Sequence, residues 1–105
     1  MVPKGAVKGE LMSRYLVERT FFVSEEEMQH VGRRSRAIAE EKFPEITWEH
    51  SHVVVDDEGT VKTFCLYGAP DEDTIRRHAE QLGEHRVEGI YEVAGDVTPS
   101  DFPPV

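Results

Sequence analysis

The sequence contains only one cysteine, Cys65, among its 105 residues. A single cysteine cannot form a disulfide within the chain, which agrees with a reducing compartment. No stretch approaches the roughly 18 consecutive apolar residues of a membrane-spanning helix, and no apolar signal-peptide region follows the first residues. We therefore expect a cytoplasmic protein with no membrane partner.

Basic residues are also few. The chain has 12 lysine and arginine residues against 21 aspartate and glutamate residues, so its formal net charge at pH 7 is −9. Such a surface repels nucleic acid and anionic membranes, and we expect neither as a partner. A metal cation or a basic protein surface fits the sign of this charge better.

The composition that remains predicts one small globular domain. A hydrophobic fraction of 38% is too high for a disordered chain, and the length suffices for one core but not for two. We assign the domain to residues 14–93. A flexible N-terminal extension is expected at 1–13 and an irregular, proline-containing tail at 94–105.

The hydrophobic pattern predicts the order β-α-β-β-α-β. Ser24 and Glu27 form an S-x-x-E capping box at the start of the first helix, and Gly83 ends the second. This order is typical of an α+β, ferredoxin-like fold, in which two helices cover one face of a four-stranded antiparallel sheet. The expected strands are 14–22, 46–55, 60–67 and 88–93, and the expected helices are 24–42 and 72–82.

The second face of this predicted sheet has no helix to cover it. In a chain of this size, an uncovered apolar sheet face is usually packed against the same face of another copy. We therefore predict a homodimer that forms through the open sheet face.

The hairpin between the second and third strands decides which reactive side chains share a face. Residues that face each other in an antiparallel pair lie on the same side of the sheet. An even loop, of two or four residues ending at Gly59, places His50, His52 and Cys65 together.

An odd loop of five residues, 56–60, has the opposite result. It pairs Ser51 with Cys65 and sends both histidines to the other face. We expect an even loop, because it directs apolar residues of both strands toward the helices, namely Val53, Val55, Phe64 and Leu66.

With an even loop, the open face holds Glu18 from the first strand together with His50, His52 and Cys65. A carboxylate, two imidazoles and a thiolate are typical ligands of a borderline or soft divalent cation such as Ni²⁺, Zn²⁺ or Cu²⁺. The alternative is that these side chains are polar members of the dimer interface and bind no metal.

Four segments together resemble a small bacterial family of nickel-binding, nickel-responsive proteins, which is also grouped as a domain of unknown function. The resemblance covers about residues 14–93. The segments are R-Y-L-V-E-R at 14–19, W-E-H-S-H at 48–52, T-F-C-L-Y-G-A-P-D-E at 63–72 and I-R-R-H-A at 75–79.

This resemblance implies a ferredoxin-like fold, a dimer whose sheets form an α/β barrel, and binding of nickel without an established reaction. Storage, buffering or sensing of the metal would follow. The residues whose types match the family pattern are Glu18, His50, Cys65 and His78. An aromatic residue is more usual in that pattern at the position of His52.

A different class of function is a small dimeric α/β-barrel enzyme of the monooxygenase or isomerase type. It requires a pocket between helices and sheet, lined by Tyr15, Tyr67 and His78, with a general base near neutrality. No nucleophile, base and orienting residue occur at an informative spacing, so we favour metal binding. A dimeric interaction module without a ligand is the third possibility.

Overall fold

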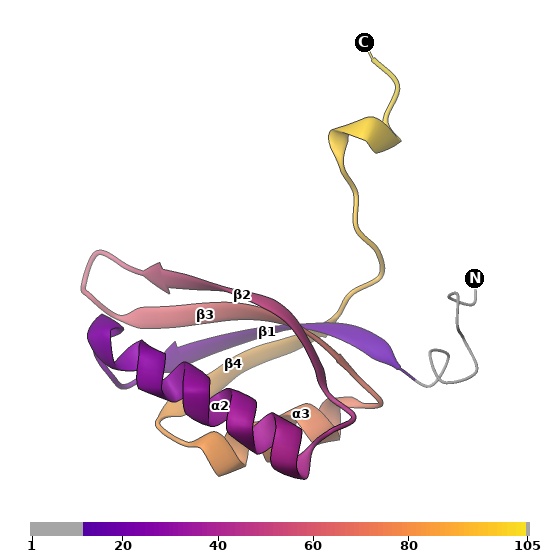
Figure 1. Ribbon diagram of the computed structural model, residues 1–105. Coiled ribbons are helices and arrows are strands. Elements are labelled where there is room, and N and C mark those ends of the chain that lie inside the picture. The colour runs from indigo at the N-terminus through magenta and orange to yellow at the C-terminus, as the bar shows by residue number, and fades with distance from the viewer. Residues whose placement is uncertain (1–11, 105) are drawn as a thin grey trace.

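The computed structural model describes residues 12–104 and shows one four-stranded sheet with two helices (Figure 1). All strand pairs are antiparallel, in the order β2-β3-β1-β4, and α2 and α3 lie on the same face. The predicted α+β, ferredoxin-like fold is confirmed. The bounds are β1 Ser13–Phe21, η1 Glu25–Glu27, α2 Met28–Lys42, β2 Thr47–Val55, β3 Val61–Ala69, α3 Glu72–Leu82, β4 His85–Glu92 and η2 Pro99–Asp101.

The predicted helix signals act as capping interactions. The Ser24 hydroxyl accepts a hydrogen bond from the Glu27 amide, and the Glu27 carboxylate accepts one from the Ser24 amide, so the capping box is present. The first turn is a 3-10 turn, and α2 continues from it. At α3, the Asp71 carboxylate accepts from the Thr74 amide, and Gly83 ends the helix with a φ of 69°. These local bonds satisfy amides that have no partner within the helix.

Two strands are longer than predicted. β3 continues to Ala69, and β4 begins at His85 rather than at residue 88. Glu84, which follows Gly83, also has a positive φ, and its carbonyl accepts a hydrogen bond from the Phe22 amide at 2.9 Å. This tight connection returns the chain to β1 directly after α3.

The core lies between the helices and β1, β3 and β4. Alternate residues of β1 and β3 face the helices, as the strand period requires. One cluster surrounds Val17 and Ile75, which are 0% and 1% exposed, and a second contains Phe21, Val31, Val61 and Leu82. No residue of β2 is buried, so this edge strand lies outside the core.

The start of β1 and the end of β4 lie at the same end of the sheet (Figure 1). Of the flexible extension predicted at 1–13, residues 1–11 lie outside the described part of the chain. Ser13 already belongs to β1. Residues 94–104 leave the sheet after the Val93 amide has donated to the Arg14 carbonyl, and they contain η2. Among the residues described, no helix has both the length and the apolar character needed to cross a bilayer.

Candidate functional site

The β2–β3 hairpin contains the odd loop, so the prediction of an even loop is wrong. Val55 pairs with Val61, and Ser51 pairs with Cys65. A change of one residue in loop length reverses the side on which every β2 side chain lies relative to β3. His50 and His52 therefore face away from Cys65, together with Phe64 and Leu66, which had been expected to face the helices.

Asp56 is the reason for this loop length. Its side chain accepts hydrogen bonds from the amides of Glu58 and Thr60, both at 2.9 Å, and its own amide donates to the Thr60 carbonyl. Gly59 donates to the Asp56 carbonyl and has a φ of 82°. Three residues between a bonded pair, with glycine last at positive φ, are typical of a type I turn followed by a glycine bulge.

A second irregularity lies at Glu49. The register shifts between Trp48, which pairs with Tyr67, and His50, which pairs with Leu66. Trp48 thus faces the helix side, where its indole N–H donates to the Ser51 hydroxyl at 2.8 Å. Because of this bulge, Trp48 and His50 lie on opposite faces of the sheet although they are only two residues apart.

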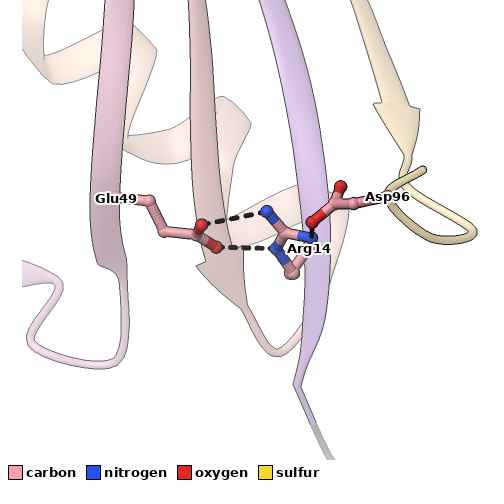
Figure 2. Close-up of polar contacts among 3 residues, drawn as sticks. All are labelled: Arg14, Glu49 and Asp96. Carbon is pink, nitrogen blue, oxygen red and sulfur yellow. Dashed lines mark hydrogen bonds and ion pairs between the residues drawn. The ribbon is translucent and has the colours of Figure 1, made fainter. Parts of the chain in front are cut away.

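Glu49 instead binds Arg14 on β1 through two hydrogen bonds of 2.8 and 3.0 Å, as Figure 2 shows. Arg14 also contacts Asp96 of the tail at 2.8 Å. The Glu49 hydrogen bond is the main cause of a raised pKa for Arg14, and the Arg14 bond is the main cause of a lowered pKa for Glu49. Because the groups are about one-third exposed or more, such pairs contribute only about 0.2–1 kcal/mol each.

Three of the five predicted ligands lie on the open face, but only two of them are adjacent. His50 and His52 are exposed on β2, and their ring centroids are 5.2 Å apart at an interplanar angle of 82°. Glu18 lies on the same face of β1, but both it and His52 pair with Phe64 of β3. The carboxylate is therefore separated from the histidines by one strand.

Within residues 12–104, no group of three or more histidine, cysteine, aspartate or glutamate side chains is arranged to hold a metal ion. The joint site of Glu18, both histidines and Cys65 that an even loop predicts is thus not assembled within one chain. Of the predicted ligands, His50 and His52 are the two that one chain places next to each other.

Cys65 lies on the helix side and is 4% exposed. It belongs to the core cluster around Val17 and Ile75, and its thiol donates to the Thr63 hydroxyl at 3.4 Å. The sheet therefore lies between its sulfur and the two imidazoles.

His78 is also on the helix side and is 1% exposed. Its Nε2 lies 3.0 Å from the Ser35 carbonyl, so this nitrogen donates, and the ring packs edge-on against Phe43. His78 is thus tied to α2. Burial is the main cause of a lowered pKa for His78, and repulsion from Arg19 lowers it further. The hydrogen bond to Ser35 raises the pKa and offsets part of this effect.

His78 and His85 make stability sensitive to mild acid. Burial is the main cause of a lowered pKa for both, against an ordinary value of 6.5. The unfolded chain therefore binds more protons below that value, and the free energy of unfolding should fall as the pH is lowered through about 6.5. Urea denaturation at several pH values between about 7.5 and 5.5 measures this slope.

The matched comparison uses two variants, one double and one single. His78→Gln together with His85→Gln should flatten the slope, whereas His30→Gln, at an exposed position of α2, should leave it unchanged. Carboxylates with lowered pKa values titrate below this window. An unaltered slope in the double variant would show that other groups cause the dependence.

Arg19 is the residue that sequence reasoning missed. It is 1% exposed, and its Nε and Nη2 are buried without a hydrogen-bond partner in the part of the chain that the structure describes. The guanidinium lies over the Tyr67 ring, 5.2 Å from the centroid, which offsets part of the cost of burial by about 0.5–2 kcal/mol. Its burial could have been predicted from the sequence, because strand alternation places Arg19 between Val17 and Phe21 on the core-facing side of a strand.

Arg19 lines a cavity of about 230 Å³ between α2 and the sheet. Cys65 and Tyr67 also line it, but the Tyr15 and His78 that the enzyme alternative requires do not. Burial is the main cause of a raised pKa for Tyr67, so its hydroxyl stays protonated at neutral pH. The cavity thus contains the positive charge of Arg19. Of the three residues that the enzyme alternative requires, only Tyr67 lines it, and Tyr67 cannot act as a base at neutral pH.

One family model matches most of the chain. It carries the description "Nickel responsive protein SCO4226-like" and matches residues 15–93. Comparison with curated proteins and with solved structures gives no match.

Proposed function

We propose that this chain, which belongs to the family of nickel-responsive proteins described as SCO4226-like, binds Ni²⁺ on the open face of its sheet. Storage, buffering or sensing of the metal would be its role. Zn²⁺ and Cu²⁺ have overlapping ligand preferences, because imidazole suits all three ions.

The observation that carries this proposal is the pair formed by His50 and His52. Their exposed rings lie 5.2 Å apart on one edge strand, close enough for one ring nitrogen of each to reach a common ion. Neutral imidazole is a strong ligand for borderline divalent metals. The net charge of −9 also favours the approach of a cation.

A second copy of the chain supplies the ligands that one histidine pair lacks. The open face has half-buried Leu16, Phe64 and Leu66, and exposed Val54 and Tyr91. We propose that two such faces pack together as a dimeric α/β barrel. A twofold axis then repeats every side chain of the face, so Glu18 of one copy can approach the histidines of the other.

Cys65 and His78 are not included in this site. Both are buried on the helix side, and Cys65 lines the same cavity as the Arg19 guanidinium. A divalent cation in that cavity would be repelled by a positive charge at short range in a medium of low dielectric constant. Their roles as ligands remain predictions that follow from the resemblance alone.

Native mass spectrometry of protein produced without a histidine tag tests this function. We expect a dimer that retains Ni²⁺ and loses it on exposure to a chelator or to acid, since imidazole must be neutral to bind. A chain that is monomeric at micromolar concentration, or a dimer that retains no Ni²⁺, would contradict the proposal. Affinities for Zn²⁺ and Cu²⁺ measured on the same sample rank the metals.

A further inference from the structure

We propose that the cavity between α2 and the sheet binds a small organic monocarboxylate, whose charged group pairs with Arg19 and whose apolar body fills the cavity. This site lies on the opposite side of the sheet from the proposed nickel site. It is therefore a separate binding function that uses different residues.

The charge of the cavity is the first argument. Arg19 is the one charged residue that lines it within the described part of the chain. No carboxylate of residues 12–104 lines it, although the sequence has 21 aspartate and glutamate residues. An otherwise acidic protein therefore encloses a space in which an anion is favoured and a metal cation is opposed.

The second argument is that two nitrogens of Arg19 have no hydrogen-bond partner among the described residues. Nε and Nη2 lie on the same edge of the guanidinium plane, and this edge binds both oxygens of one carboxylate in parallel. In Arg19 both of these nitrogens are buried, and no residue of 12–104 is their hydrogen-bond partner. To meet a carboxylate, the guanidinium has to turn toward the cavity, and neither nitrogen gives up a hydrogen bond in doing so.

The remaining walls define the rest of the ligand. Phe21, Met28, Val31 and Leu82 supply apolar surface, and hydroxyl groups such as that of Thr63 are few and uncharged. A volume of about 230 Å³ accommodates roughly ten non-hydrogen atoms at the packing density of protein interiors. A dianion such as phosphate would keep one charge without a partner beside these walls, so a monoanion fits better.

The cavity is accessible from the side of β2. Trp48 and Val53 line it and are 37% and 52% exposed, whereas Thr63 and Tyr67 at the sheet are buried. Trp48 is the single tryptophan of the chain. Its fluorescence therefore reports on the entrance without a label.

Phenylacetate is the probe for the test, because it combines one carboxylate with an apolar ring at the required size. Phenylacetate is titrated into protein that carries no tag and no metal, in whichever oligomeric state it is purified. Trp48 fluorescence and the melting temperature are recorded. We expect a saturable fluorescence change and a rise in melting temperature. Phenylacetamide, which has the same shape without the charge, should bind at least about tenfold more weakly.

Two variants place the ligand in this cavity. Arg19→Met removes the cation and should weaken phenylacetate binding at least about tenfold. Gly32→Leu fills the space from α2; nothing lies within 4 Å of a Cβ at Gly32, so the helix accommodates the side chain. Gly32→Leu should abolish phenylacetate binding. If Arg19→Met does not fold, the Gly32→Leu variant alone tests whether the ligand binds in this cavity.

The control variant is Arg86→Met, which removes an exposed arginine and should leave binding unchanged. Absence of saturable binding to the wild-type chain, or equal binding of phenylacetate and phenylacetamide, would overturn the proposal. So would full binding by the Gly32→Leu variant. None of these results depends on nickel, so the proposed nickel function stands or falls separately.

Discussion

Replacement of His50 by alanine is expected to lower the affinity for Ni²⁺ at least about tenfold, whereas Cys65→Ser should leave it unchanged. The reason is the hairpin register, which places His50 beside His52 on the open face and Cys65 in the core on the other side. Isothermal titration of tag-free protein with Ni²⁺ measures both affinities. His52→Ala should resemble His50→Ala, because neither imidazole can replace the other.

His30→Ala is the matched control, because it removes an exposed histidine of α2 far from the pair in sequence. It should leave nickel affinity unaltered. A loss with Cys65→Ser as large as that with His50→Ala would show that the thiol is a ligand and would contradict the assignment of the site to the open face.

Arg19→Met is expected to stabilise the ligand-free protein by about 1–3 kcal/mol, because an unpartnered buried guanidinium is replaced by an apolar side chain of similar length. The lost stacking on Tyr67 reduces this gain but does not cancel it. Urea denaturation measures the change as a higher midpoint with an unaltered slope. Prior refolding from denaturant removes any anion that copurifies.

Arg86→Met again provides the comparison, since its side chain is 63% exposed and pairs only at the surface. Its effect should stay within about 0.5 kcal/mol. If Arg19→Met instead lowers stability by more than about 1 kcal/mol, the guanidinium has partners in solution that the structure does not contain.

The sequence alone was sufficient for the type and order of the secondary structure. Strand period, the Ser24–Glu27 capping box and the Gly83 terminator are local signals, and each acts through bonds between residues close in sequence. The face on which each β1 residue lies was predictable for the same reason, since alternation alone puts Val17 in the core and Glu18 on the open face.

The face on which His50 and Cys65 lie was not predictable with the same security. It depends on whether the hairpin loop has an odd or an even number of residues, and both choices direct apolar side chains of β2 and β3 toward the helices. Hydrogen bonds of Asp56 to Glu58 and Thr60 favour the odd loop. These bonds are part of the folded hairpin and have no signature in the hydrophobic pattern.

The sequence by itself thus determined the fold and the family likeness, because periodicity and capping are local properties. Only the tertiary structure decided which reactive side chains meet. It put the histidine pair outside and the cysteine inside through a single residue of loop length, and it enclosed Arg19 beside a cavity. Partners across a sheet are set by register and packing, which the hydrophobic pattern does not encode.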